Sequence, residues 1–183
     1  MLTRAFYARD PRVVAEELIG KYLVHALASG TIGGRIVEVE AYLGPEDRAS
    51  HARFGPEGRS SLMYGPAGIA YVFLIYGMHE CFNVVTGEHG EGSAVLVRAL
   101  EPLPGVARCD GPGRLTRACA IDRRHNGQRL EAGTLYIEDR HEPLPRVKTT
   151  ARIGVDYAGA WAKRKLRYVD RDSKALSVRL PTR

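Results

Sequence analysis

The sequence predicts an α+β fold: a single domain over residues 1–183, in which a curved, mostly antiparallel and barrel-like β-sheet is surrounded by a few helices and carries a protruding β-hairpin. Three observations favour this class. Runs of β-branched and aromatic residues outnumber helical runs and follow one another closely, so neighbouring strands can pair locally. A chain of 183 residues is long enough for one well-buried core. No proline-rich or serine-rich spacer divides it.

The first predicted element is a helix within "RDPRVVAEELIGK", residues 9–21. The side chain of Asp10 is suited to cap the helix N-terminus, and Pro11 fits the first turn, where no backbone N–H is needed. Gly20 is a typical stop. The apolar residues between these signals recur at helical spacing and form one face: Val13, Val14, Leu18 and Ile19.

Two hairpins and a further strand are predicted next. The runs "YLVHAL" (22–27) and "GRIVEVEAY" (34–42) are separated by "ASGTIG", which has the glycine and small polar residues of a hairpin turn. The run "IAYVFLIYGMHECFNVV" (69–85) divides into two apolar strands joined near Tyr76-Gly77-Met78. After the polar loop "TGEHGEG", the run "SAVLVRAL" (93–100) supplies another strand.

The remaining segments are shorter. Between the hairpins lies a long glycine- and proline-rich stretch (44–68), in which only "PEDRASHAR" (45–53) is expected to be helical. A short helix is expected at about 114–121, after "DGPG", and a second helical run in "YAGAWAKRK" (157–165). Strands are expected near "GTLYIED" (133–139) and "RVKTTAR" (146–152), with a closing strand near "LSVRL" (176–180). Long loops of this kind often carry function.

Composition excludes several classes of protein. Apolar runs are broken well before the roughly twenty residues that span a bilayer, and the N-terminus lacks a secretory signal, so we expect a soluble, cytoplasmic protein that binds no membrane. The three cysteines (Cys81, Cys109 and Cys119) form no C-x-x-C pair and read as small buried side chains. The six histidines show no ligand spacing, so we expect no metal and no cofactor.

Charge is distributed unevenly along the chain. The net charge is +6, and the last 33 residues contain 9 Lys and Arg against 3 Asp and Glu, so this segment carries the whole excess. Such a basic segment attracts polyanions, of which nucleic acid is the usual one. A soluble surface that happens to be rich in arginine is the other interpretation, and charge alone does not decide between them.

The segment "VEVEAYLGPEDRASH" (37–51) concentrates titratable side chains where a strand ends. Strict alternation predicts two faces, one with Val37, Val39 and Ala41 and the other with Glu38, Glu40 and Tyr42. On pattern alone, the polar face is that of a half-exposed strand in water. A catalytic interpretation is also open, because a carboxylate can take a proton from water while tyrosine and histidine rings can hold a flat substrate.

Several motifs in order resemble the alkyladenine (3-methyladenine) DNA glycosylases: "VEVEAYLGPEDRASH", "YVFLIYGMHECFNVV", "VLVRALEP", "DGPGRLTRACAI" and "RIGVDYAGAWAKRKLR". The likeness covers most of the chain. It implies a base-excision-repair enzyme that flips a damaged purine out of double-stranded DNA and hydrolyses its N-glycosidic bond, leaving an abasic site. The implied bases are alkylated or deaminated purines such as 3-methyladenine, 7-methylguanine, hypoxanthine and ethenoadenine.

The resemblance also implies roles for individual residues. Glu40 corresponds to the base that activates water, while Tyr42 and His51 sandwich or contact the flipped base. Tyr76, at the hairpin tip, corresponds to the residue that intercalates into the DNA in place of the flipped nucleotide. Asn83 lines the pocket and screens against the exocyclic amine of guanine. Arg98 corresponds to the arginine beside the flipped nucleotide, and on a buried strand it needs an anionic neighbour, either a phosphate or Glu40.

The expected mechanism uses an ionised Glu40 to stabilise the oxocarbenium-like sugar while it deprotonates the incoming water. No protein nucleophile is needed, so we expect a monofunctional glycosylase without AP lyase activity. Cationic alkylated purines are expected to bind electron-rich rings well. Neutral bases also need a proton, for which water, His51 or a backbone-bound proton are the alternatives.

One position departs from the family pattern. Where relatives often have Y-V-Y, this chain has "YVF", which places Phe73 at the second aromatic position. We expect Phe73 to contact the base by stacking but to lack a hydroxyl. The range of excised bases, or the rate of excision of neutral bases, is then expected to differ from that of relatives with tyrosine at this position. Phe73 as ordinary core filling is the alternative.

The main competing function is a non-catalytic, basic, β-rich module that binds RNA, including tRNA, or DNA. A pure binder has no reason to carry Glu40 together with Tyr42 and His51. A sugar hydrolase with Glu38 and Glu40 as its acid pair is a third and weaker interpretation. We therefore expect a monomeric enzyme that acts on damaged duplex DNA in the cytoplasm, with the bacterial nucleoid as its location in a prokaryote.

Overall fold

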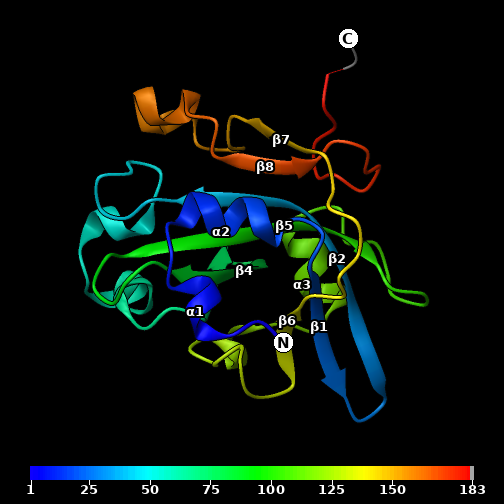
Figure 1. The fold of residues 1–183 in the computed structure, drawn as a ribbon. Helices are drawn as coiled ribbons and strands as arrows, with labels where there is room; N and C mark the ends of the chain where they lie inside the picture. The colour runs from blue at the N-terminus through cyan, green and yellow to red at the C-terminus, as the bar shows by residue number, and fades with distance from the viewer. Residues whose placement is uncertain (182–183) are drawn as a thin grey trace.

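The computed structural model describes residues 1–181. Its centre is one eight-stranded sheet with the order β3-β4-β5-β2-β1-β6, to which β8 is joined through β2 and β7 through β8. Every pairing between these strands is antiparallel. The sheet curls around the molecule, with helices on its outer faces (Figure 1). The predicted α+β class with a curved antiparallel sheet is confirmed.

The first half of the chain builds most of the sheet. Helices α1 (Arg4–Tyr7) and α2 (Pro11–Leu18) precede β1 (Tyr22–Leu27) and the long β2 (Gly30–Tyr42). Two 3-10 helices follow, η1 (His51–Phe54) and η2 (Gly58–Tyr64). The second hairpin consists of β3 (Ala70–Ile75) and β4 (His79–Thr86), and β5 (Ser93–Pro102) pairs with β4 on one side and β2 on the other.

The second half adds the elements around this sheet. They are α3 (Pro112–Ala118), η3 (Arg123–His125), β6 (Leu135–Glu138), β7 (Val147–Thr150), η4 (Asp156–Lys163) and β8 (Arg167–Asp170). Helix α2 lies across β2 and β5, where Leu18 packs into the main core with Ile36 and Val97. The Asp10 carboxylate accepts from the Arg12 N–H at the start of α2, as predicted, and Gly20 ends it with a φ of +90°.

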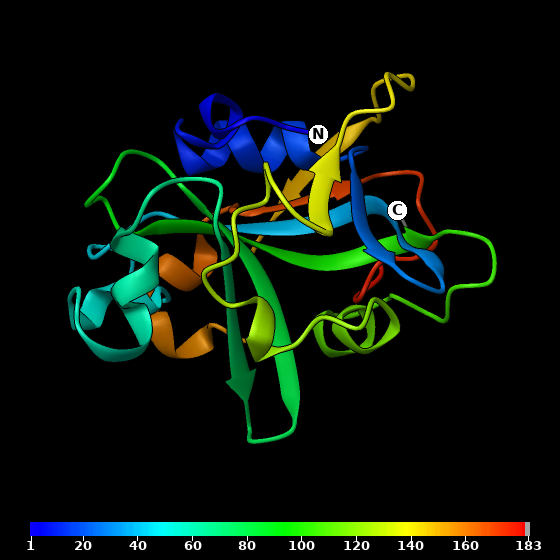
Figure 2. The ribbon, with the colours of Figure 1, turned by 90° about the horizontal axis from the view of Figure 1, so that it is seen from below.

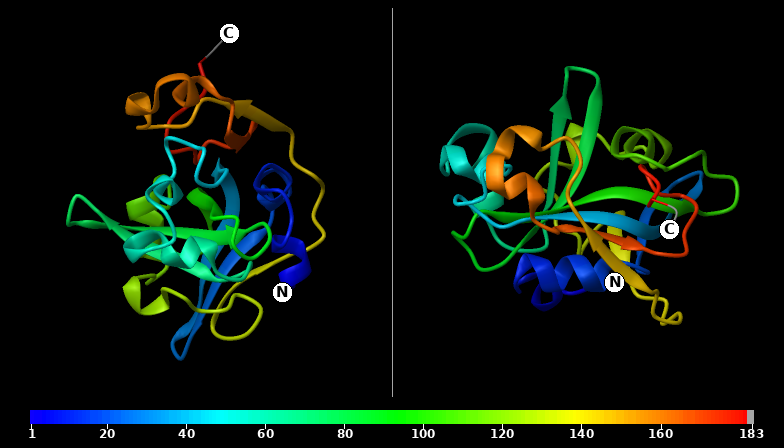
Figure 3. Two further views of the ribbon diagram at one scale, coloured as in Figure 1. Left: turned by 90° about the vertical axis from the view of Figure 1, so that its left-hand side faces the viewer. Right: turned by 90° about the horizontal axis from the view of Figure 1, so that it is seen from above.

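The β3–β4 hairpin projects away from the body of the molecule, with η1, η2 and η4 on one side of its base and α3 on the other (Figures 2 and 3). Its turn has Tyr76 and Gly77 at φ values of 52° and 68°, and the Met78 N–H donates to the Ile75 carbonyl at 3.1 Å. A tyrosine rarely adopts a positive φ, because its Cβ crowds the backbone there. The turn therefore holds an uncommon residue in a mildly strained position, which is typical of functional sites.

Two register shifts in the β2–β5 pairing change the direction in which side chains of these central strands point. Val39 is opposite Val97 and Glu38 is opposite Ala99, so Arg98 has no partner in the register. Bulges of this kind turn a side chain away from the regular alternation. On β2 the register also shifts at Val37, which packs in a small cluster apart from the main core. The strict alternation predicted for β2 is thus wrong at this residue.

Three other local predictions need correction. Residues 45–50 form turns and not a helix, because the Asp47 carboxylate accepts from the backbone N–H groups of Leu43 and Ala49. Residues 176–180 form no strand, and the closing strand is β8, which begins at Arg167, nine residues before the predicted first residue. The run 157–165 is helical only as 3-10 turns, interrupted by a non-helical Gly159.

No helix in residues 1–181 has the length and apolar character needed to cross a bilayer. The three cysteines are buried and free, as expected.

Candidate active site

A cavity of about 590 Å³ opens at the base of the β3–β4 hairpin. Its wall is made by residues from β2, the η1–η2 segment, the hairpin, β5 and the loop before η4. The residues with the greatest chemical interest in it are Tyr42, His51, Tyr71, Phe73, Tyr76, Asn83, Arg98 and Tyr157. The structure thus brings six of the seven predicted site residues to the lining of one cavity, and the seventh, Glu40, is buried behind this lining.

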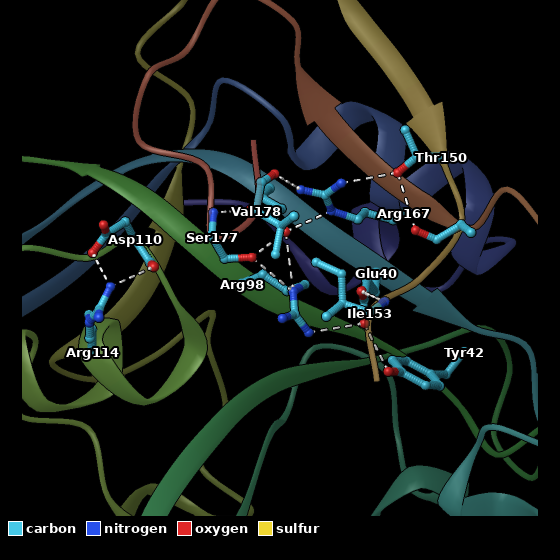
Figure 4. Close-up of polar contacts among 12 residues, drawn as sticks. Glu40, Tyr42, Arg98, Asp110, Arg114, Thr150, Ile153, Arg167, Ser177 and Val178 are labelled. Carbon is cyan, nitrogen blue, oxygen red and sulfur yellow. Dashed lines mark hydrogen bonds and ion pairs between the residues drawn. The ribbon is translucent and has the colours of Figure 1, made fainter. Parts of the chain in front are cut away.

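Glu40 is completely buried, with 0% of its surface exposed. Its Oε2 accepts from the Tyr42 hydroxyl at 3.0 Å and from Arg98 Nη1 at 3.4 Å, while its Oε1 accepts from the Ile153 N–H at 2.8 Å (Figure 4). Tyr42, Arg98 and Ile153 all line the cavity. The carboxylate is therefore one layer behind the wall, and the half-exposed strand face that pattern alone predicts is wrong.

Arg98 links two buried carboxylates. Its Nη1 contacts Glu40, and its Nε donates to Glu38 Oε1 at 3.2 Å. The same Glu38 oxygen accepts from Arg167 Nε at 2.7 Å and from the Ser177 hydroxyl at 2.6 Å, and Glu38 Oε2 accepts from the Ser177 N–H at 2.6 Å. The anionic neighbour expected for Arg98 is thus provided by both glutamates, and the four charges balance.

The C-terminal segment closes this network. Ser177 supplies two of the hydrogen bonds to Glu38, and the Val178 carbonyl accepts from Arg167 Nη2 at 2.6 Å (Figure 4). These contacts explain why residues 176–180 run as an irregular strap instead of a strand. Sequence reasoning missed Arg167 and Ser177, because they are 129 and 139 residues from Glu38 and no local pattern marks them.

An aromatic wall faces the cavity from η1 and β3. The rings of His51 and Phe73 lie with centroids 4.5 Å apart, and those of Tyr71 and Phe73 are 5.2 Å apart. His51 Nδ1 shares a hydrogen bond of 2.9 Å with the Tyr71 hydroxyl. Burial lowers the pKa of His51, with the charges of Arg59 and Arg53 acting in the same direction, so the ring is neutral at pH 7. Tyr71 was not predicted from the sequence, although it begins the "YVF" motif.

Tyr42 completes the opposite side of the site. Burial raises the pKa of Tyr42 well above its usual value, and the negative charge of Glu40 adds to the rise. The phenol therefore keeps its proton and donates it to Glu40 in a hydrogen bond. Behind Tyr42, Arg152 and Asp47 form a fully buried ion pair that the sequence analysis did not identify.

Asn83 and Tyr76 occupy different environments. Asn83 is buried, and its Nδ2 donates to the carbonyls of Tyr71 at 3.0 Å and Cys81 at 3.4 Å. Its amide is therefore fixed in the cavity wall. Tyr76 is 89% exposed at the hairpin tip, where its ring is accessible to a binding partner. The neighbouring Met78 is also largely exposed, so the tip presents two apolar side chains to solvent.

The basic C-terminal segment is less available than its composition indicates. Arg152 and Arg167 are buried and neutralised by Asp47 and Glu38. Other cations stand at the cavity itself, where Arg59 and Arg123 belong to its lining. The positive field expected from residues 151–183 is thus partly internal, and part of the positive charge near the site comes from elsewhere in the chain.

Comparisons with known proteins agree on one family. The family model for methylpurine-DNA glycosylase (MPG) matches residues 5–174. A protein of Anaeromyxobacter sp. (strain Fw109-5) named "Putative 3-methyladenine DNA glycosylase" is 54% identical over 169 residues, which cover 91% of this chain and 87% of the relative. Proteins with the same name from Myxococcus xanthus (strain DK1622) and Legionella pneumophila (strain Corby) are 50% and 48% identical, with coverage of 96% of this chain in both cases and 93% and 97% of the relatives.

Proposed function

The chain belongs to the methylpurine-DNA glycosylase family, and from this membership together with the site we propose that it excises alkylated and deaminated purines from double-stranded DNA by hydrolysis of the N-glycosidic bond. The observation that carries the proposal is the buried Glu40 carboxylate, which lies directly behind an aromatic-walled cavity of about 590 Å³. Cavities of roughly 300–1,000 Å³ suit ligands of nucleotide size.

The damaged nucleotide has to leave the duplex before it can reach this cavity. Extrusion of a base costs a few kcal/mol, which stacking in the pocket and a plug in the DNA can offset. We assign the plug to Tyr76, because it stands exposed at the tip of a projecting hairpin in a conformation that tyrosine rarely adopts. In the cavity the purine stacks between Tyr42 on one side and the rings of His51 and Phe73 on the other.

The chemistry is assigned to Glu40. Among the residues that the structure describes, Oε2 accepts two hydrogen bonds and Oε1 accepts one, from Ile153, so Oε1 keeps an unused lone pair. Because Glu40 is 0% exposed, we propose that the cavity wall shifts when DNA binds and admits a water molecule to Oε1. This oxygen takes the proton as water attacks C1′ of the sugar, while the negative charge stabilises the oxocarbenium-like transition state. Arg98 holds the carboxylate in place through Oε2, whereas Ile153 binds Oε1.

A monofunctional mechanism fits the lining of the cavity. A glycosylase that also cleaves the strand commonly uses an amine as nucleophile. No lysine belongs to the lining within residues 1–181, and Glu40 is restrained by three donors that leave it as a base. We therefore propose water as the nucleophile and an abasic site as the product.

Cationic and neutral purines make different demands on the site. A 3- or 7-alkylated purine already carries a positive charge and leaves readily, whereas hypoxanthine needs a proton. His51 is a poor candidate for the acid, because its lowered pKa keeps it neutral. Water and a backbone-bound proton are the alternatives that remain. Asn83, which is held rigidly by two carbonyls, is assigned to exclude the exocyclic amine of guanine.

Base release from defined duplexes tests the proposal. The purified protein is incubated with duplexes that carry hypoxanthine, ethenoadenine or 7-methylguanine, and abasic sites are revealed by alkali. We expect alkali-dependent strand breaks at the lesion, unchanged by chelator, and no breaks without alkali. Breaks without alkali would exclude the monofunctional mechanism. Tight binding of the same duplexes without any base release would favour a non-catalytic binder, the alternative that the sequence left open.

A further inference from the structure

A buried ion pair supports the rear of Tyr42. The side chains of Asp47 and Arg152 are both 0% exposed, and they are joined by two hydrogen bonds, from Nη1 to Oδ2 at 2.5 Å and from Nη2 to Oδ1 at 2.8 Å. Nη1 also donates to the carbonyl of Ala41 at 2.9 Å. The bidentate pairing fixes the plane and position of the guanidinium.

This guanidinium lies over the Tyr42 ring, with Cζ 4.7 Å from the ring centroid. Tyr42 lines the cavity, whereas Arg152 does not belong to the lining. The ring therefore separates the cationic end of the Arg152–Asp47 ion pair from the space in which the purine is proposed to stack. A purine on the cavity side and Arg152 on the rear side share the same π system.

The charge of Arg152 acts on Tyr42. Burial and the charge of Glu40 raise the pKa of Tyr42, and Arg152 is the largest of the groups that oppose this rise. A cation on one face of a ring also draws the π electrons towards itself. The opposite face then attracts a second cation less, while stacking of a neutral base is little affected.

We propose that Arg152, held by Asp47, is a specificity-determining residue, whose positive charge behind Tyr42 reduces the preference of the ring for cationic bases and so extends the range of excised purines to neutral ones. This inference rests on the proposed function and on the stacking role of Tyr42. It predicts that the enzyme gains little from the positive charge of an alkylated purine when it captures the base.

A purely structural role would have a different signature. Ile153, the residue after Arg152, donates its N–H to Glu40, so loss of the ion pair also shifts the catalytic carboxylate. Such a shift lowers the maximal rate for every substrate. The charge effect, in contrast, changes the affinity for cationic bases relative to neutral bases. A structural role is therefore seen in the maximal rates, and the charge effect in the half-saturation concentrations.

The test compares 7-methylguanine with its neutral isostere 7-methyl-7-deazaguanine, in duplexes that are otherwise identical. Single-turnover kinetics give the half-saturation concentration for the first, and inhibition gives the affinity for the second. In Asp47→Asn/Arg152→Gln, both charges are removed and a planar amide remains. We expect the preference for the cationic base to rise roughly three- to tenfold, within the range of cation–π effects. Arg152→Lys retains the charge and should stay within about twofold of the wild type.

A matched control breaks another ion pair, one outside the cavity lining. Arg35 Nη2 contacts Asp170 Oδ2 at 2.7 Å, and neither residue lines the cavity. The control Arg35→Met/Asp170→Asn should leave the preference unchanged. An unchanged preference in the Asp47→Asn/Arg152→Gln enzyme, or an equal change in Arg152→Lys, would overturn the inference.

The remaining outcomes are also decisive. If Asp47→Asn/Arg152→Gln does not fold, Asp47→Asn/Arg152→Met removes the same charges with an apolar side chain. The wild type adds a test that needs no variant, because a preference above about tenfold for the cationic member of the isosteric pair would contradict the inference. Failure of the wild type to release any of the damaged bases would instead contradict the proposed function. The effect of the Arg152 charge would then be tested by the relative binding affinities for the cationic and the neutral duplex.

Discussion

The network around Glu38 makes a quantitative prediction about stability. Glu38 is fully buried and accepts from Arg98, Arg167 and Ser177, so Glu38→Gln leaves Arg167 without its carboxylate partner and Arg98 with Glu40 alone. Removing one partner from a buried ion pair typically costs about 3–5 kcal/mol. We expect a loss of about 3 kcal/mol in the free energy of unfolding, at the lower end, because glutamine can still accept hydrogen bonds and Arg98 keeps Glu40.

The double variant isolates the pairing itself. Arg167→Gln alone leaves Glu38 with Arg98 as its one remaining cation, and we expect a loss of about 3 kcal/mol as well. In Glu38→Gln/Arg167→Gln the orphaned charge is gone, so the total loss should be about 4 kcal/mol instead of the sum of about 6 kcal/mol.

Urea unfolding followed by circular dichroism at pH 7 measures all four proteins, with the slope of the transition as a check on two-state behaviour. If the sum of the two single losses lies within about 0.5 kcal/mol of the double loss, Glu38 and Arg167 are not coupled, since additivity indicates independent sites. Arg35→Met is a control for the loss of an arginine elsewhere, and it should show no such coupling with Glu38→Gln.

Three further predictions concern DNA binding and pH. Tyr76→Ala should weaken binding to lesion duplexes about ten- to a hundredfold, because a stacking side chain is lost. Thermal stability and binding to undamaged duplex should stay unchanged. Equal losses of affinity for both duplexes, measured by fluorescence anisotropy, would show that Tyr76 contacts only the DNA backbone. Because the pKa of His51 in the folded protein lies below the ordinary value of 6.5, the contribution of His51 to stability is present above pH 6.5 and is lost as the pH falls below 6.5 towards the folded pKa. Between pH 7.5 and pH 5 the thermal midpoint of His51→Asn should therefore fall less than that of the wild type. Parallel curves of thermal midpoint against pH would contradict this. Affinity for undamaged duplex should fall steeply with added salt, since phosphate contacts dominate non-specific binding; a salt-independent affinity would show that the exposed arginines do not contact phosphate.

The elements that the sequence predicts correctly are those whose signals are local. Asp10, Pro11 and Gly20 specify α2 at both ends, and both hairpins follow from apolar runs around short turns. The projecting hairpin and the antiparallel sheet follow from the same signals. The extent of the domain over residues 1–183 remains a prediction.

Elements fixed by distant partners were not predictable. Residues 45–50 turn because Asp47 binds its own neighbours and Arg152, which is 105 residues away. Residues 176–180 are held by Glu38 and Arg167 in place of a ladder of backbone hydrogen bonds. A pattern read over a short stretch of sequence does not reveal these distant contacts, since each segment alone has the composition of a helix or a strand.

The candidate site divides in the same way. Glu40, Tyr42 and His51 lie in one short motif, and the resemblance to a known family supplied their expected roles. Arg98 was expected to need an anion, but a bulge in β5 aims it at two carboxylates, and a bulge leaves no signal in a single sequence. The roles of all seven residues remain proposals.

Glu40 is proposed to activate the water that displaces the base. Single-turnover base release from a hypoxanthine duplex by Glu40→Gln, measured beside binding of the same duplex, tests it most directly. We predict a rate at least roughly a hundredfold below that of the wild type, with affinity for the duplex within about threefold. Base release at the wild-type rate would contradict the claim and assign the chemistry to another group.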